Sequence, residues 1–110
     1  DIDLTATCLR IPVKTGHSES INIEFENLFD FANIKKILRD SPGCKVLDEH
    51  KDGGYVTPLE VEDNHTTFIS RIRKDNSNIK AVNLWVVSDN LLKGAALNTV
   101  QIAEHLINKK

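Results

Sequence analysis

The chain has 110 residues and a formal net charge of −2, with acidic and basic residues mixed along its length. A length of this order fits one domain with a modest core. The mixed charge argues against a dedicated nucleic-acid surface, which normally shows clustered Lys and Arg. No apolar run approaches the ~20 residues that span a bilayer. We therefore expect neither a nucleic-acid nor a membrane partner.

The two cysteines, Cys8 and Cys44, lie far apart and form no CxxC pair. A disulfide scaffold would need more of them, and a structural zinc site needs four ligands at recognisable spacing. His50, His65 and His105 are scattered as well, so we expect no metal site and a reducing, cytoplasmic setting. The chain contains no methionine and opens in strand-like sequence, which predicts a fragment of a longer protein.

The first elements follow from hydrophobic periodicity. Residues 5–13 are rich in β-branched side chains and are stopped by Pro12, which predicts a strand. After turn residues at 14–16, residues 20–26 alternate between apolar and polar side chains, as a half-buried strand does. The connection is too short for a parallel crossover, so we expect an antiparallel hairpin. Helical spacing over 29–39 then predicts a helix.

The second half continues the alternation of strands and helices. A short strand is expected at 45–47, followed by a long loop at 50–64. Residues 67–73 and 81–87 have the pattern of two more strands, and the second is apolar on both faces, which places it centrally in its sheet. A helix is predicted at 95–107. This order predicts an α+β fold with a mostly antiparallel sheet and helices on one face.

Two residues near the predicted hairpin have chemistry that fits a site. Arg10 lies inside the first strand and His17 just beyond the turn, so the hairpin would place them on opposite arms near the loop. A guanidinium grips a carboxylate with two parallel hydrogen bonds, and an imidazole transfers protons near neutral pH. Together they suit a small anionic substrate. Spacing alone favours a simpler interpretation, in which Arg10 pairs with a surface carboxylate and His17 caps a turn.

Other residues carry weaker signals. Cys8 would share a strand face with Arg10 and could act as a nucleophile, but a small buried thiol is the commoner role. Arg71 and Arg73 alternate on a predicted strand, where an anionic partner and a solvated or interface face both fit. Trp85 is expected to pack in a core or an interface. No glycine-rich loop for a dinucleotide or a phosphate follows a predicted strand.

Two longer segments carry specific motifs. Residues 5–25 read TATCLRIPVKTGHSESINIEF, and residues 84–104 read LWVVSDNLLKGAALNTVQIAE. The first is similar to a C-x-R-[IV]-P-V strand followed by G-H-S-E, and the second to W-x-x-x-D-N-L-x-K-G-A-A-x-N-x-V-Q-I-A-E. Both patterns belong to the aspartate-semialdehyde dehydrogenase family, which the chain resembles. YVTPLEVE and FISRIRKDNS, between them, resemble that family's T-P and R-I-R-x-D segments.

The resemblance implies that residues 1–110 form a glyceraldehyde-3-phosphate dehydrogenase-like C-terminal domain for substrate contacts and dimerisation. The Rossmann domain that binds NADP would precede it and lie outside the chain. The family oxidises L-aspartate 4-semialdehyde to L-4-aspartyl phosphate with NADP and phosphate, in the synthesis of lysine through diaminopimelate, threonine and methionine. The resemblance further implies a homodimer or tetramer, and the chain alone is expected to be inactive.

The resemblance also implies roles for three residues. His17, in the GHS motif, would take the proton of a catalytic thiol that the N-terminal part supplies, so neither Cys8 nor Cys44 is assigned that role. Arg10 would hold the substrate carboxylate, and Asn90 would reach the nicotinamide carboxamide. Two alternatives remain at this point, a non-catalytic dimerisation module and a related reductase acting on N-acetyl-glutamyl phosphate.

Overall fold

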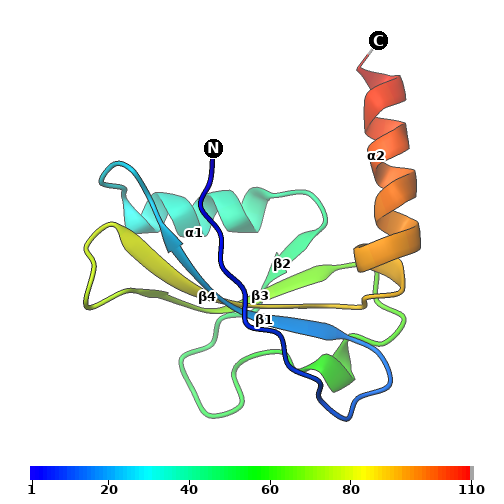
Figure 1. Ribbon diagram of the computed structural model, residues 1–110, viewed down its shortest axis with the longest axis horizontal. Coiled ribbons are helices and arrows are strands. Elements are labelled where there is room, and N and C mark those ends of the chain that lie inside the picture. The colour runs from blue at the N-terminus through cyan, green and yellow to red at the C-terminus, as the bar shows by residue number, and fades with distance from the viewer. Residues whose placement is uncertain (110) are drawn as a thin grey trace.

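A computed structural model describes residues 1–109, and Lys110 lies outside that description. Its four-stranded sheet has the order β1-β4-β3-β2 (Figure 1). The elements are β1 His17–Glu24, α1 Phe31–Asp40, β2 Cys44–Val46, a 3-10 turn Pro58–Glu60, β3 Thr67–Lys74, β4 Ala81–Ser88, a π-type turn Leu92–Ala96 and α2 Leu97–Asn108. Only β2 pairs in parallel, with β3. The predicted α+β class with a mostly antiparallel sheet is confirmed.

β4 lies in the middle of the antiparallel part of the sheet, as its apolar pattern predicts. It pairs with β1 on one side and with β3 on the other. Val82 and Leu84 belong to the cluster under α1, whereas Val87 belongs to the cluster on the opposite face, and all three are buried. A strand that is buried on both faces needs apolar side chains at odd and even positions.

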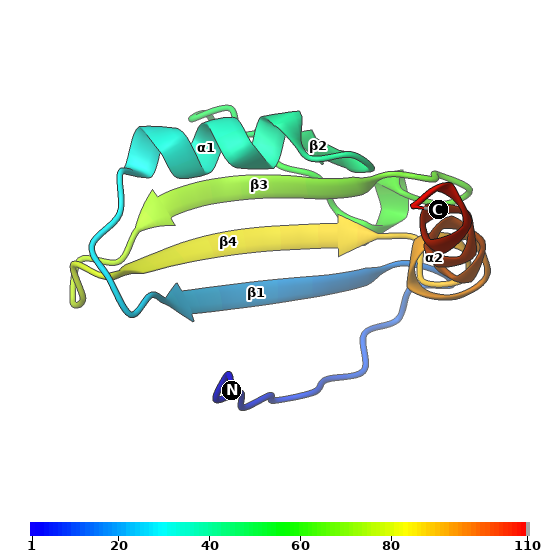
Figure 2. The same cartoon turned by 90° about the horizontal axis from the view of Figure 1, so that it is seen from above.

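α1 covers one face of the sheet (Figures 1 and 2). Asp30 caps the helix, because its side chain accepts a hydrogen bond from the backbone N–H of Ala32 at 3.0 Å. Ile34 and Leu38 then recur at helical spacing and pack on the cluster that contains Ile72. The predicted helix over 29–39 is confirmed within two residues.

The opposite face is covered in part by the loop between β2 and β3. Val56 and Val61 from this loop form a cluster with Phe68 and Val87 of the sheet. Trp85 packs against this cluster, and its Nε1 donates to the carbonyl oxygen of Val56 at 2.8 Å. The predicted packing role of the tryptophan is confirmed, and its indole N–H ties the loop to the central strand.

The prediction of a strand at residues 5–13 is wrong, because residues 1–16 form no strand. The segment runs past the free edge of β1 without pairing with it (Figure 2). Pro12 has no N–H to give to a ladder, and the Val13 N–H bonds back to the carbonyl of Ile11 at 2.9 Å. The predicted hairpin is therefore absent. Cys8, expected to be buried in it, is exposed.

α2 stands at one end of the sheet, on the same side as α1 (Figure 1). The helix has no buried residue, and Val100 and Ile107 of its apolar stripe are 54% and 70% exposed. The predicted helix at 95–107 is confirmed from Leu97 onward, preceded by the π-type turn. Among the described residues 1–109, no helix has the length and apolar content needed to cross a membrane.

The burial pattern predicts unequal costs for the same substitution at two isoleucines. Ile72 is 1% exposed beneath α1, whereas Ile79 is 81% exposed in the β3–β4 turn. Ile72→Ala should lower the free energy of unfolding by about 2–5 kcal/mol, because it leaves a cavity in the core. Ile79→Ala should change it by less than about 0.5 kcal/mol. Urea unfolding measures both, and equal losses would contradict the core as described.

Candidate functional site

The predicted site residues gather, in part, at the end of the sheet where β1 begins and β4 ends. His17 is the first residue of β1 and pairs with Ser88, the last residue of β4. Asn90 follows two positions later, in the connection to α2. His17 is exposed at this end, so its imidazole is open to a ligand or to another polypeptide. The structure thus brings His17 and Asn90 to one end of the sheet.

Asn90 is tied directly to the residue before His17. Its Oδ1 accepts a hydrogen bond from the backbone N–H of Gly16 at 2.7 Å, across 74 positions of sequence. Gly16 is buried and has φ +96°, a conformation that favours glycine. A Cβ at this position would lie 2.8 Å from the carbonyl oxygen of Pro58. The backbone that leads into His17 is therefore held from two sides.

Asp89 organises the connection that carries Asn90. Its Oδ1 accepts the backbone N–H groups of Leu91 at 2.8 Å and of Leu92 at 3.2 Å. Its Oδ2 accepts the N–H of Asp63, in the loop before β3, at 2.9 Å. Asp63 itself has φ +58°. One carboxylate therefore joins the end of β4 to the loop that precedes β3.

The environment of Asp89 favours its charged form. The residue is 2% exposed, and burial acts to raise its pKa. The three backbone hydrogen bonds, together with the charge of nearby His65, act in the opposite direction and outweigh burial. The pKa of Asp89 consequently lies below its ordinary value, and the junction is held by an ionised carboxylate at neutral pH.

Arg10 is not brought to this end by any strand pairing. It lies in the exposed segment before β1, and no hydrogen bond or ion pair joins it to another of the described residues. The hairpin that was expected to place Arg10 opposite His17 does not form. The convergence of these two side chains on one ligand therefore stays a prediction.

Sequence reasoning missed the residues that fix this end of the sheet. A turn was predicted at residues 14–16, but neither the hydrogen bond of Gly16 to Asn90 nor the burial of Asp89 was predicted. An Asp-Asn pair directly after a largely apolar strand is a usable signal, since polar side chains at a strand end often bond to neighbouring backbone groups. Nothing in the local sequence indicates that Gly16 is the hydrogen-bond partner of Asn90, because the two residues are 74 positions apart.

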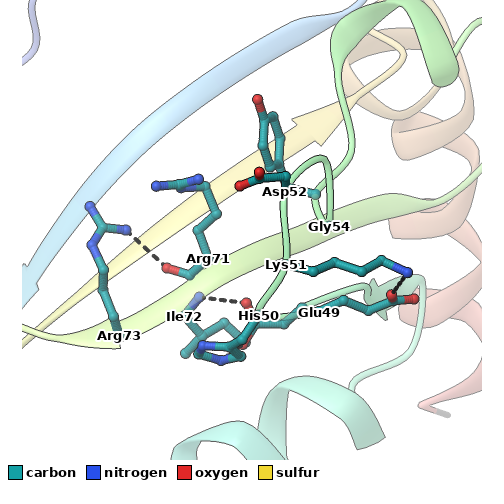
Figure 3. Close-up of a pocket in the computed structure, with 10 residues that line it drawn as sticks. Glu49, His50, Lys51, Asp52, Gly54, Arg71, Ile72 and Arg73 are labelled. Carbon is teal, nitrogen blue, oxygen red and sulfur yellow. Dashed lines mark hydrogen bonds and ion pairs between the residues drawn. The ribbon is translucent and has the colours of Figure 1, made fainter.

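A second group of charged side chains lines an open cavity of about 370 Å³ beside β3 (Figure 3). Arg71 sits at an irregularity in the β3–β4 register with φ +52°, and its guanidinium lies 5.2 Å from the centre of the Tyr55 ring. Arg73 donates from Nη1 to the carbonyl of Arg71 at 2.9 Å. Both arginines are exposed. An anionic partner for them stays a prediction.

This cavity is separate from the His17 end of the sheet. Arg73 pairs with Asn83 of β4, whereas His17 pairs with Ser88, five residues further along the same strand. At ~3.3 Å per residue, the two pairs are about 17 Å apart along the sheet. A ligand the size of a four-carbon acid at one place would not reach the other.

The described residues also limit what this chain can bind by itself. Within residues 1–109 no three His, Cys, Asp or Glu side chains gather as metal ligands do. No glycine-rich loop leads from a strand into a helix N-terminus, the arrangement that cradles a dinucleotide pyrophosphate.

Sequence comparison decides the family. Residues 1–93 match the family described as semialdehyde dehydrogenase, dimerisation domain. The chain belongs to this family. An aspartate-semialdehyde dehydrogenase of Rickettsia bellii is 46% identical over 106 residues, which cover 96% of this chain and 31% of that protein. The Bacillus subtilis enzyme of the same name is 46% identical over 109 residues, again with 96% and 31% covered.

Solved structures of aspartate-semialdehyde dehydrogenases are also similar to this chain. Aspartate semialdehyde dehydrogenase II from Vibrio cholerae, complexed with ASA, is similar at a TM-score of 0.83 with 34% identity, over 93% of this chain and 30% of that one. A probable aspartate-semialdehyde dehydrogenase from Pseudomonas aeruginosa gives 0.76 with 34% identity, over 87% and 28%. The chain thus spans about 31% of the length of the curated relatives named above. The family resemblance predicted from the motifs is confirmed.

The lowered pKa of Asp89 predicts how the stability of this dimerisation domain depends on acid. An unfolded Asp titrates near ~3.9, and the folded group titrates below that value. Its contribution is therefore complete above pH ~4 and is lost as pH falls through the folded pKa. Asp89→Asn should lower stability at pH 7 and flatten the fall in stability below pH ~4. Thermal unfolding measured from pH 7 to pH 3 tests this. A variant whose stability falls with pH as steeply as that of the wild type would contradict it.

Proposed function

We propose that this chain is the substrate-binding and dimerisation domain of an aspartate-semialdehyde dehydrogenase. The complete enzyme would oxidise L-aspartate 4-semialdehyde to L-4-aspartyl phosphate, with NADP and phosphate, in the synthesis of lysine through diaminopimelate, threonine and methionine. The family match over residues 1–93 and the 46% identity to enzymes of that name support this proposal. The Rossmann domain and the catalytic cysteine would lie outside these residues.

His17 is the proposed general base of the reaction. It stands in the GHSE motif, exposed at the start of β1, on a backbone that Gly16, Asn90 and Pro58 hold in place. An imidazole in such a place can accept the proton of a cysteine thiol as the sulfur attacks an aldehyde carbon. In the later step, in which phosphate displaces the sulfur from the thioester, the same imidazole can return that proton to the leaving thiolate.

Arg10 is the proposed ligand of the substrate's α-carboxylate. Its guanidinium can form two parallel hydrogen bonds to one carboxylate, which fixes the aldehyde in line with the attacking sulfur. Arg10 is exposed and has no bonded partner among the described residues, so it is available for such a contact. A lysine would keep the positive charge but could not form the two parallel hydrogen bonds.

Asn90 is the proposed contact to the nucleotide from this domain. Its Oδ1 is taken by Gly16, which leaves the Nδ2 group to donate to a nicotinamide carboxamide. A bound nicotinamide would supply the hydride acceptor for the oxidation. The residues of this chain hold the substrate, move the proton and orient the reacting group, while the nucleotide phosphates would be bound elsewhere.

The proposed enzyme is a homodimer or tetramer, which accords with the family description as a dimerisation domain. The exposed apolar side chains of α2, such as Val100 and Leu106, would be covered by another part of the complete protein. The two cysteines, Cys8 and Cys44, are free thiols, which fits a cytoplasmic location.

The full-length protein should form NADPH from aspartate semialdehyde and NADP only when phosphate is supplied. His17→Ala should lower kcat by about 10²- to 10⁴-fold, the usual contribution of a positioned general base. His50→Ala is the matched control, because His50 is exposed beside Asp48, near the edge of the sheet opposite β1. The kcat of this variant should stay within a few-fold of the wild-type value. Absorbance at 340 nm measures both. A fully active His17→Ala enzyme would remove the assigned role.

A further inference from the structure

We propose that Asn90 is a positioning residue for His17, acting through the backbone N–H of Gly16. The inference rests on the proposed role of His17 as the proton acceptor and goes beyond the contact to the nucleotide. Asn90 would not touch the substrate in this role. It would fix the direction in which the first residue of β1 presents its imidazole.

The hydrogen bond is placed where it has the greatest effect on His17. Gly16 is the neighbour of His17, and its N–H meets Asn90 Oδ1 at 2.7 Å. On the other side, His17 enters the β1–β4 ladder opposite Ser88. The backbone of His17 is thus held before and after the residue, so the torsions of its own side chain are the freedom that remains.

Gly16 cannot easily take another conformation. Its φ of +96° lies in the region that other residues rarely adopt, and Pro58 closes the space on its side-chain face. Without the acceptor on Asn90, the buried N–H of Gly16 would lose its only side-chain partner and would need water or a backbone shift to compensate. Such a shift would be passed directly to His17.

Asn90 itself is held by the junction that Asp89 organises. The carboxylate of Asp89 binds the N–H groups of the next two residues, Leu91 and Leu92. The carbonyl of Asp89 accepts from Lys93 at 3.0 Å and from Gly94 at 3.2 Å. These bonds fix the backbone on both sides of Asn90. Its side chain can therefore act as a rigid link between the β4–α2 connection and the residue that precedes β1.

An amide is better suited to this link than a carboxylate. Asn90 offers the oxygen that Gly16 needs and a neutral Nδ2 donor beside it. An aspartate would keep the oxygen but add a negative charge near His17, which favours the protonated imidazole. The neutral side chain therefore holds the backbone before His17 without adding a charge there.

The test compares three variants of the full-length enzyme by a readout that needs no nucleotide. The active-site thiol is alkylated with iodoacetamide across pH 5–9, which reports how readily His17 accepts its proton. Asn90→Ala removes the acceptor, and Gly16→Ala strains the backbone that carries the donor, so both should slow alkylation at pH 7 and lower kcat on the order of 10- to 100-fold. Asn90→Asp keeps the acceptor but loses the Nδ2 donor, so it is judged by alkylation alone, and its alkylation rate at pH 7 should stay within a few-fold of wild type.

Hydrogen exchange of the Gly16 amide shows whether the link itself is lost. Asn90→Ala should expose this amide to exchange, whereas Asn90→Asp should keep it protected. The proposal is overturned if Asn90→Ala raises the KM for NADP while thiol alkylation and kcat stay at wild-type values. His17→Ala separates the two claims, because unchanged alkylation in that variant rejects the role of His17 itself.

Discussion

The buried carboxylate of Asp89 is the group on which this end of the molecule depends. It accepts backbone N–H groups from the turn before α2 and from the loop before β3, two segments that have no ladder between them. Because the charged carboxylate accepts three backbone N–H groups, it holds the connection after β4 against the loop before β3. Asn90 is then aimed at Gly16, and the start of β1 is fixed. The position of His17 therefore depends on the hydrogen bond made by the preceding residue, Gly16, as well as on its own pairing with Ser88.

In the proposed enzyme, this domain would supply part of the active site, and the rest would come from another domain or subunit. His17 and Asn90 lie at one end of the sheet, on a rigid scaffold of paired strands. Arg10 lies on an exposed segment beside an unpaired strand edge. Apolar side chains in the same segment, such as Leu4 and Leu9, are also exposed, at 85% and 86%. We expect this segment to form a strand in the proposed enzyme, where a neighbouring domain or subunit would bury these side chains.

Most of the fold could be predicted from local pattern, and the failures have a common cause. The alternation around Ile21 and the apolar run around Leu84 predicted β1 and β4, because each strand meets its partners within this domain. The pattern at residues 5–13 is equally strand-like, yet among the described residues this segment does not pair with the free edge of β1. The motif around His17 predicted a site residue. It did not predict the hydrogen bond between Gly16, the preceding residue, and Asn90, which is 74 positions from Gly16 in the sequence. Long-range contacts of single polar side chains leave no periodic trace in a sequence.

The central claim is that Arg10 and His17 belong to one site, completed only in the full-length protein. A crystal structure of that protein with a bound four-carbon substrate analogue measures this directly. The account predicts that residues 5–13 form a strand, with the Arg10 guanidinium forked on the ligand carboxylate and the His17 imidazole within reach of the catalytic sulfur. An Arg10 side chain paired with a surface carboxylate, or a ligand bound away from His17, would contradict it.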